Sequence, residues 1–341
     1  MNCTLPLTAE QANGILYFNN YGTIKVKNMH VCVWVAFLLL PQIANALDFN
    51  IQPRIDAGAV YFEFDQSDFN FRANSTDQFP AAVDGFKLRD TMPFVRGGIT
   101  FFVDRFFLDV DIQYAFDGDD TTQFSTSSVL PGRTFRNLPL PAAAAVDNRI
   151  DSEFDRTEFA VSAGFAITEH FVIFAGYKRA ETNFNNEMQG ELEIVLPNNS
   201  MVRGPVSGSY DVDFIYDGPF VGSAYTWDIQ TDFIEGGLAA NIGVAFLDGK
   251  TRLEFGNFLF DDGSGQETLE PSSIANLVAA SDLKGDTIGI SLGIQWLGFT
   301  PVKQLTYTLG VNGYRYDFDG SNTADFTDTL VRFSVGVQYL F

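Results

Sequence analysis

Residues 106–116 read Phe-Phe-Leu-Asp-Val-Asp-Ile-Gln-Tyr-Ala-Phe, and this stretch decides the fold class. Asp109, Asp111 and Gln113 fall on one face of an extended chain, while the even-numbered residues on the other face are all apolar. Successive side chains of a strand point to opposite faces, so this alternation predicts a β-strand with one apolar and one polar face. Residues 287–296 and 331–341 repeat the pattern.

Three further features favour a membrane barrel over a soluble sandwich. The apolar faces end in aromatic residues such as Trp227, Trp296 and Tyr339, as at the interfaces of a bilayer. Short connections alternate with long ones, and the chain ends on a strand. No apolar run reaches the roughly 18 residues that a membrane-spanning helix needs. We therefore expect an all-β, transmembrane, antiparallel up-and-down β-barrel.

The pattern predicts about ten strands, and eight or twelve remain open. The expected strands are 54–64, 92–103, 106–117, 154–167, 171–183, 219–229, 233–247, 286–297, 304–317 and 328–341. The expected turns are Asp104-Arg105, 168–170, 230–232 and 298–303, and the expected long extracellular loops are 65–91, 118–153, 184–218, 248–285 and 318–327. In an alternative pairing, 233–246 and 251–260 form a hairpin through Asp248-Gly249, which leaves 210–229 outside the barrel.

The first 46 residues have the features of a secretory signal peptide. Lys25 and Lys27 precede the apolar run VCVWVAFLLL at 31–40, and Ala44 and Ala46 occupy the small-residue positions before a cleavage site. We expect residues 1–46 to be the signal peptide and residues 47–341 to form the barrel with its long loops. Both cysteines, Cys3 and Cys32, precede the expected cleavage site.

Charge and composition exclude several classes of function. Lys and Arg number 21 against 43 Asp and Glu, a net charge of −22, so the chain repels nucleic-acid phosphates and no nucleic-acid partner is expected. The only histidine after the signal peptide is His170, in an expected turn, so no outer loop supplies the base of a catalytic triad. After the signal peptide the chain has one histidine and no cysteine, so it lacks the usual ligands of a zinc site. We expect no enzyme and no obligatory cofactor.

The polar faces of the strands predict the lining of the lumen. Charges of both signs on neighbouring strands are most simply internal ion pairs that fill a narrow bore. A pore constriction that acts on passing solutes is the alternative. The expected lumen-lining residues are Arg96, Asp109, Asp111, Gln113, Arg156, Glu158, Glu235, Asn241, Gln295, Asn312, Arg332 and Gln338.

Acidic residues gather at the expected outer ends of the strands. Hard cations prefer several carboxylate oxygens, so Ca²⁺ or Mg²⁺ could bind there and bridge to lipopolysaccharide phosphates. Simple solvation of the acidic groups is the alternative. The candidate ligands are Asp117, Asp119, Asp120, Asp317 and Asp319.

The carboxy-terminal strand resembles the signal by which outer-membrane barrels are recognised for assembly. The matching positions are Phe333, Val335, Val337, Tyr339 and the terminal Phe341. Gly218-Pro-Phe-Val-Gly222 and Ala175-Gly-Tyr-Lys178 are similar to segments of uncharacterised Gram-negative outer-membrane barrels of this size. The resemblance implies a place in the Gram-negative outer membrane, lipid and lipopolysaccharide as neighbours, and assembly by the barrel-assembly machinery.

Together these features predict an outer-membrane protein with a structural or binding role. The long acidic loops would carry that role at the cell surface, with a ligand that the sequence does not name. A small passive pore for cations or small polar solutes is the alternative function.

Overall fold

A computed structural model describes the backbone of ten segments of the chain. These are residues 50–66, 70–71, 81–82, 86–135, 138–195, 201–230, 235–269, 284–302, 304–320 and 326–341. Side chains within them are described except at 66, 70–71, 81–82, 86, 124–135, 138–146, 195, 235, 267, 269 and 320. The predicted signal peptide, residues 1–46, lies outside the described residues. No helix in the described segments is long and apolar enough to cross a membrane.

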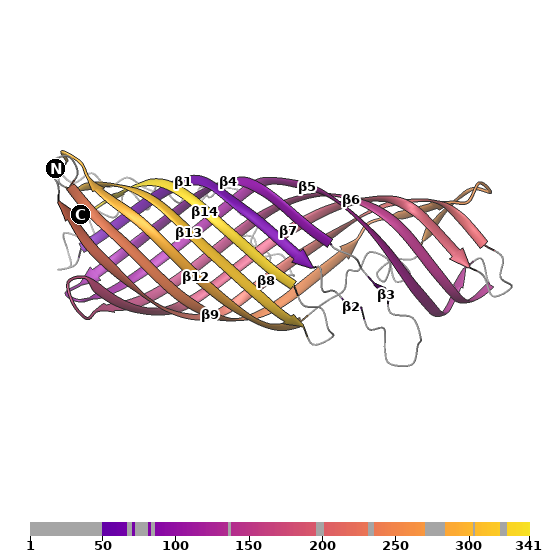
Figure 1. Cartoon of the computed structure of the whole chain (residues 1–341), viewed down its shortest axis with the longest axis horizontal. Coiled ribbons are helices and arrows are strands. Elements are labelled where there is room, and N and C mark those ends of the chain that lie inside the picture. Colours follow the sequence, from indigo (N-terminus) through magenta and orange to yellow (C-terminus); the bar gives the residue numbers. More distant parts are fainter. Residues whose placement is uncertain are drawn as a thin grey trace, which may run out of the picture. The chain divides into compact units, whose positions relative to one another are not determined.

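The described strands form a closed antiparallel ring (Figure 1). One sheet contains twelve strands, of which β10 and β11 extend from the edge of β8. The other ten pair in the order β1-β4-β5-β6-β7-β8-β9-β12-β13-β14, and β14 pairs again with β1. The chain is therefore an all-β, up-and-down barrel with the predicted number of strands.

The strands of the ring differ greatly in length. Their bounds are β1 (Asn50–Gln66), β4 (Phe86–Val103), β5 (Phe106–Phe135), β6 (Leu138–Ala166), β7 (Phe171–Val195), β8 (Met201–Gln230), β9 (Glu235–Phe255), β12 (Lys284–Phe299), β13 (Leu305–Gly320) and β14 (Phe326–Tyr339). Outside the ring lie β10 (Phe258–Asp261), β11 (Gln266–Leu269) and a separate pair, β2 (Asn70–Phe71) with β3 (Ala81–Ala82).

One end of the barrel carries the short connections, and we call it the turn end. Asp104 and Arg105 join β4 to β5, and Asp104 has a φ of 54°, which Asp tolerates better than most residues. A second bend covers 167–170, and the last residue of the chain, Phe341, donates its backbone N–H to Ile51 at the same end. At this end the predicted strand limits agree with the observed ones to within two residues, except that β1 begins at Asn50, four residues before the predicted start at 54.

At the opposite end, which we call the far end, the loop predictions are wrong in the described residues. The expected loops 118–153 and 184–218 consist largely of strand, because β5 to β8 continue well beyond the other strands of the ring. In the expected loop 248–285, β9 continues to Phe255 and β10 and β11 follow, and in the expected loop 65–91, β4 already begins at Phe86. In Figure 1 β5 to β8 extend past the ends of β1 and β14.

Side chains still alternate there, since Phe184, Asn186 and Met188 are buried, but the apolar face points inward and the polar face outward. The sequence pattern of an apolar outer face is therefore absent from these strands.

The alternative pairing of β9 is also wrong. β9 runs through Asp248-Gly249 without a turn, and β8 pairs with it from Tyr210 opposite Phe255 to Gln230 opposite Glu235. Residues 210–229 therefore belong to the barrel wall.

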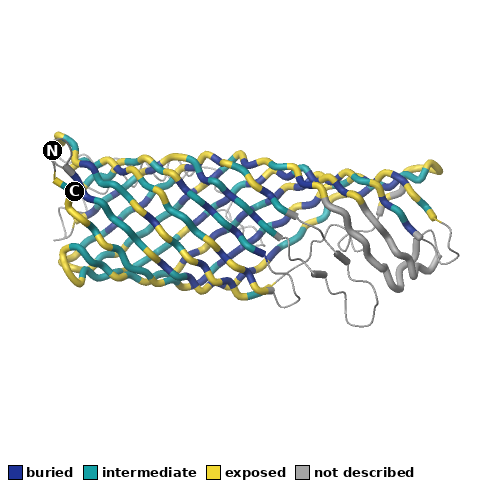
Figure 2. Tube along the Cα trace, viewed as in Figure 1, coloured by how far each residue is buried: buried dark blue, intermediate teal, exposed yellow. Residues whose placement is uncertain are grey.

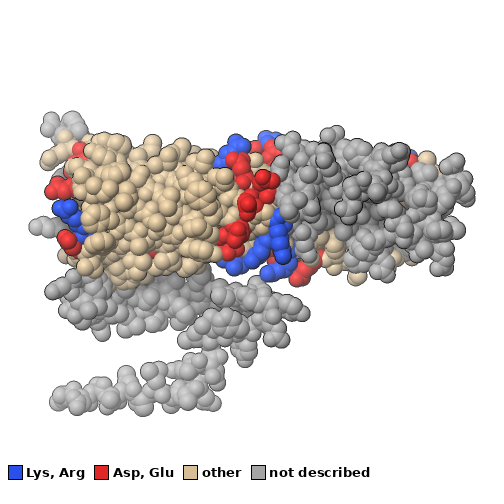
Figure 3. Space-filling view, turned by 90° about the horizontal axis from the view of Figure 1, so that it is seen from below, with Lys and Arg blue, Asp and Glu red and all other residues tan. Residues whose placement is uncertain are grey.

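The barrel has two zones that differ in which face of the wall is apolar, the outer or the inner. Near the turn end the outward side chains are apolar, as at Phe106, Leu292 and Phe333, while charged groups point inward. Toward the far end the inward side chains are apolar, such as Phe62 and Phe184, and charged groups point outward. Figure 2 shows the alternation of burial along the strands, and Figure 3 shows an uncharged band bounded by a belt of charged side chains.

Candidate functional site in the bore of the barrel

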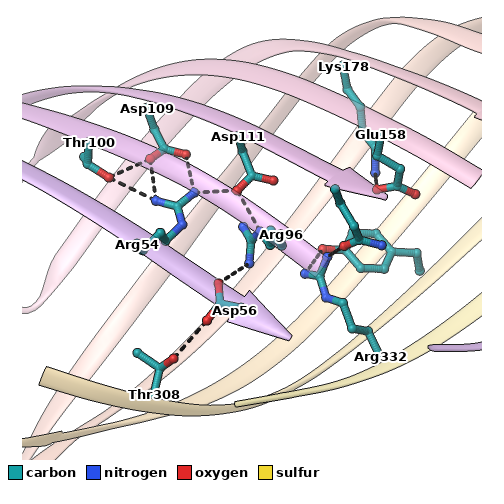
Figure 4. Close-up of polar contacts among 12 residues, drawn as sticks. Arg54, Asp56, Arg96, Thr100, Asp109, Asp111, Glu158, Lys178, Thr308 and Arg332 are labelled. Carbon is teal, nitrogen blue, oxygen red and sulfur yellow. Dashed lines mark hydrogen bonds and ion pairs between the residues drawn. The ribbon is translucent and has the colours of Figure 1, made fainter. Parts of the chain in front are cut away.

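A cluster of ion pairs lies on the inner wall near the turn end, and we call it the lower ion cluster: Arg54, Arg96, Asp109 and Asp111. Arg54 contacts Asp109 at 2.6 Å and Asp111 at 2.8 Å. Arg96 donates from Nε to Asp111 at 2.7 Å. The four side chains come from the neighbouring strands β1, β4 and β5, whose pairing brings them together (Figure 4).

A second group crosses the bore farther from the turn end, and we call it the upper ion layer: Arg156, Glu158, Lys178 and Asp328. Arg156 contacts Glu158 at 2.9 Å and Asp328 at 2.6 Å. Lys178 contacts Glu158 at 2.8 Å and donates to the hydroxyl of Tyr316 at 2.5 Å. Arg156 and Asp328 belong to β6 and β14, which are not neighbours in the ring, so their contact spans the interior.

Above this layer, toward the far end, aromatic side chains fill the bore. We call them the aromatic plug: Phe62, Phe64, Phe154, Phe184, Phe214 and Phe326. The rings of Phe64 and Phe214 are 4.8 Å apart between centroids, and that of Phe326 is 5.0 Å from Phe64 and 5.1 Å from Phe214. Because β1 and β8 are five places apart in the ring of ten, Phe64 and Phe214 meet from opposite walls. The bore is therefore closed at this level.

Below the plug, the inner wall encloses a cavity of about 430 Å³. Its lining includes the lower ion cluster, Lys178, Tyr314 and Arg332. Phe107, Val172, Phe174 and Phe220 also line it, so part of the wall is apolar. A volume of this size is within the range of pockets that bind small molecules.

Arg332 projects into this cavity from β14. Its guanidinium donates to the side-chain oxygen of Gln113 and to the hydroxyl of Tyr314, the latter at 2.8 Å. Tyr314 also lies beneath Lys178, whose Nζ is 4.5 Å from the ring centroid. Through Tyr314, Arg332 is thus linked to Lys178 of the upper ion layer.

The structure places the residues predicted for the lumen as follows. Arg96, Asp109, Asp111, Glu158, Asn241, Gln295, Arg332 and Gln338 line the cavity. Gln113 and Arg156 are buried in the interior, and Asn312 shares the inward face of β13 with Tyr314. The side chain of Glu235 lies outside the described residues. That these groups act on a passing solute stays a prediction.

Sequence reasoning missed several members of the interior network. Arg54 and Asp56 share one face of β1, and Asp328 shares the face of Arg332 on β14. Asp56 accepts from Thr308 at 3.0 Å and lies 3.9 Å from Arg96. The same alternation that selected Arg332 could have identified them. Lys178 was harder to find, because its inward side chain follows the exposed Tyr177 within a mixed segment.

The candidate metal ligands do not form one group. Asp117, Asp119 and Asp120 lie on β5, and Asp317 and Asp319 lie on β13, four places away in the ring. Asp120 accepts from the backbone N–H of Arg89 at 2.7 Å, and Asp317 pairs with Arg315 at 3.0 Å. Among the residues that the structure describes, no three acidic, histidine or cysteine side chains are grouped to hold a metal ion. Cation binding stays a prediction.

The terminal strand presents its matching side chains outward. Phe333, Val335 and Val337 are exposed on β14, and the rings of Tyr339 and Phe341 are 4.7 Å apart. Recognition by an assembly machinery stays a prediction. His170 lies in the bend at 167–170, with its ring 6.1 Å from that of Tyr225.

Outside the uncharged band, the surroundings of two carboxyl groups, Glu63 and Asp213, shift their pKa in opposite directions. Hydrogen bonds from Lys87 and from Tyr61 lower the pKa of the Glu63 carboxyl below its ordinary value. Burial raises the pKa of the Asp213 carboxyl; neighbouring Glu181 raises it further, and Arg252 opposes the rise.

The fold defines the class of this protein as a closed antiparallel β-barrel whose bore is blocked at the level of the aromatic plug. No protein-family profile matches the sequence. No curated protein matches it in sequence.

The chain is similar to several solved barrels. The outer membrane protease OmpT from Escherichia coli is 11% identical, with coverage of 86% of this chain and 99% of that chain and a TM-score of 0.47. The translocator domain of the autotransporter NalP from Neisseria meningitidis is 10% identical, with coverage of 90% and 95% and a TM-score of 0.30. Neisserial surface protein A is 8% identical, with coverage of 86% and 97% and a TM-score of 0.28. The fold assignment rests on the strand pairing of the chain itself.

Proposed function

We propose that the chain is a Gram-negative outer-membrane β-barrel, exported by its signal peptide, with a closed bore and a structural or binding role at the cell surface. Three features support this proposal. The outward apolar zone suits a lipid environment, charged side chains face outward at the far end, and the aromatic plug closes the interior. Because the rings of Phe64 and Phe214 meet from opposite walls and close the bore, we favour this role over a passive pore.

The outer face of the far end is the surface that a partner would meet. Glu187, Glu191 and Asp211 are exposed there, on strands that continue beyond the rest of the ring. This strongly acidic face favours a cationic ligand, or the phosphates of lipopolysaccharide through bridging cations.

Conductance across a planar bilayer tests the closed bore. We expect the folded wild-type protein to insert without producing steady current steps. The double substitution Phe64→Ala with Phe214→Ala removes two opposed rings and is expected to produce measurable current. Phe106→Ala, which removes an exposed outward ring, is the matched control and is expected to stay silent. Steady cation-selective steps from the wild-type protein would overturn the proposal and favour the pore.

A further inference from the structure

The projecting strands β5 to β8 form a sheet whose two lateral edges differ. On the side of β8, β10 pairs at Val206 and Ser207, and β11, which is only four residues long, pairs with β10. On the other side, the pairing of β4 with β5 ends at Phe94 opposite Ala115, whereas β5 continues far beyond that point. Among the described strands, none pairs with this side of β5 after Ala115, and β3, which comes close, pairs with β2. We call residues 121–131 of β5 the free edge.

The backbone of the free edge turns toward the open side at every second residue. The N–H of Asp119 donates to the carboxylate of Asp90 on β4 at 3.0 Å, so Asp119 faces the β4 side. Alternate residues of a strand direct their backbone groups to the same side, and the register with β6 is unbroken from 118 to 131. Residues 123, 125, 127 and 129 therefore face the open side as well. Pro131, the next residue in this series, has no N–H and limits the free edge.

The sequence of the free edge lacks the usual protection of an edge strand. Natural edge strands are short, or they carry Lys, Pro or a bulge that prevents further pairing. Residues 121–130 read Thr-Thr-Gln-Phe-Ser-Thr-Ser-Ser-Val-Leu, with no charged residue, no proline and no glycine. Thr, Phe and Val are residues that favour strands. This long, uncharged edge can therefore accept another strand.

The distribution of charge allows a second copy of the chain to approach this edge. The chain has a net charge of −22, and Glu187, Glu191 and Asp211 are exposed on the outer face of the projecting strands, so two such faces repel each other. Residues 121–132 carry no charge, so two free edges can meet without direct repulsion between facing residues.

A strand edge is complementary to itself when the two strands are antiparallel. Residues that direct both N–H and C=O to the open side then exchange hydrogen bonds, and a two-fold axis relates the two copies. The two free edges overlap completely when Thr126 lies at this axis. Ser125 of one copy is then opposite Ser127 of the other.

We propose that the free edge binds the free edge of a second copy of this chain as an antiparallel strand pair, which joins the projecting sheets of the two molecules. The direction of β5 determines where the second copy lies. Copies in one membrane direct β5 away from that membrane in the same sense, so their edges cannot pair antiparallel. Copies in two facing membranes direct β5 toward each other, so the pair links two surfaces. A single edge contact is small, and several copies on each surface add to its strength.

The inference names a partner for the proposed surface role and rests on that role. Self-association in detergent does not depend on whether the bore conducts, so the two tests fail separately. A monomeric protein with a silent bore would overturn this inference alone. A dimeric protein with steady current steps would overturn the closed bore alone.

Sedimentation velocity of the purified full-length protein, folded in a neutrally buoyant detergent, measures self-association over a range of concentrations. We expect the wild-type protein to form a dimer as its concentration rises. The double substitution Ser125→Lys with Ser127→Lys places like charges opposite each other and is expected to weaken the dimer by about 10-fold or more. Ser125→Glu with Ser127→Glu is expected to weaken it similarly. An equal mixture of the two variants is expected to restore the dimer, because each Lys then faces a Glu.

A matched control adds the same charge elsewhere on the projecting sheet. Ser207→Lys with Ser209→Lys changes two exposed positions of β8, which has paired neighbours on both sides, and is expected to leave the dimer unchanged. Phosphatidylcholine vesicles in two populations, with donor and acceptor dyes, test the link between facing membranes. Vesicles with wild-type protein should cluster, vesicles with the Lys variant should not, and Lys vesicles mixed with Glu vesicles should cluster again.

Circular dichroism identifies any variant that fails to fold, and the single change Ser127→Lys keeps the test valid if a double variant does so. A wild-type protein that stays monomeric at every concentration would overturn the proposal and leave the edge to a strand of another protein. A dimer that the two Lys residues do not weaken, or that mixing with the Glu variant does not restore, would also overturn it. Dimers in detergent without clustering of vesicles would overturn the link between facing membranes.

Discussion

At the residue scale, the buried charges of the upper ion layer hold the wall together from within. Arg156 is completely buried and joins Glu158 and Asp328. Burying isolated charges costs several kcal/mol per ion, so such groups persist when their partners and geometry compensate the lost hydration. Since Asp328 lies on a strand distant in the ring, this ion pair links two parts of the wall that share no backbone hydrogen bonds.

Replacing Arg156 tests the strength of that link. Arg156→Met leaves two carboxylates without this cation, and we expect a loss of about 3–5 kcal/mol in the free energy of unfolding, measured by denaturant titration in detergent. Arg149→Met removes an exposed partner of Asp151 and is the matched control, with an expected loss of about 0–1 kcal/mol. Equal losses in the two variants would show that the buried pair contributes no special stability.

At the element scale, the outward faces of the projecting strands carry directly opposed acidic residues. Asp151 faces Glu187 across β6 and β7, and Asp211 faces Glu254 across β8 and β9. Like charges in such positions destabilise a sheet. Asp213 faces Arg252, yet the pKa of its carboxyl is raised, first by burial and then by Glu181.

This raised pKa predicts a pH-dependent effect of Asp213→Asn. The folded state holds the proton of Asp213 more tightly than the unfolded state, so the stability linked to this group is present at low pH and decreases as pH rises through the raised pKa. Denaturant titration from pH 3 to about 7 should therefore show the variant gaining stability relative to wild type as pH increases.

The change Arg252→Gln removes the cation that opposes the raised pKa of Asp213. In that background the gain from Asp213→Asn should be larger near neutral pH. A stability difference between the wild-type protein and the Asp213→Asn variant that stays constant over the whole pH range would contradict the expected linkage.

At the scale of the whole molecule, the apolar face of the wall changes from the outer to the inner side along the barrel, which divides it into two zones. Near the turn end, apolar residues face outward over an interior with ion pairs. At the far end, aromatic residues fill the interior and charged groups face out. The first arrangement suits lipid outside and water or ion pairs inside, whereas the second is that of a soluble protein core. The boundary between the zones marks the level at which the barrel leaves the proposed membrane.

The loss of stability caused by a new outward-facing arginine should differ between the two zones. Leu292→Arg places a charge on the apolar outer face of β12, where Leu292 is 58% exposed, and should destabilise the barrel in lipid by about 2–4 kcal/mol. Ser207→Arg, at an exposed outward position of β8 in the far zone, is the matched control and should change stability by about 0.5 kcal/mol or less. Unfolding in lipid vesicles measures both. Comparable effects would contradict the two-zone arrangement.

Much of the architecture follows from local pattern. Period-two alternation at 106–116 and 287–296, with tight turns such as Asp104-Arg105, predicts the ten ring strands and the inward set that includes Arg96 and Arg332. The pattern fails where the apolar face turns inward. The segments around Phe184 and Tyr210 alternate as strands, but their outer faces are polar, so their sequence predicts loops instead.

Alternation within one strand determines which side chains share a face, because the geometry of an extended chain is local. It does not determine which distant strands stand opposite each other, since strand tilt and register accumulate around the whole ring. The meeting of Phe64 with Phe214 and the link from Arg156 to Asp328 therefore arise only when the barrel closes.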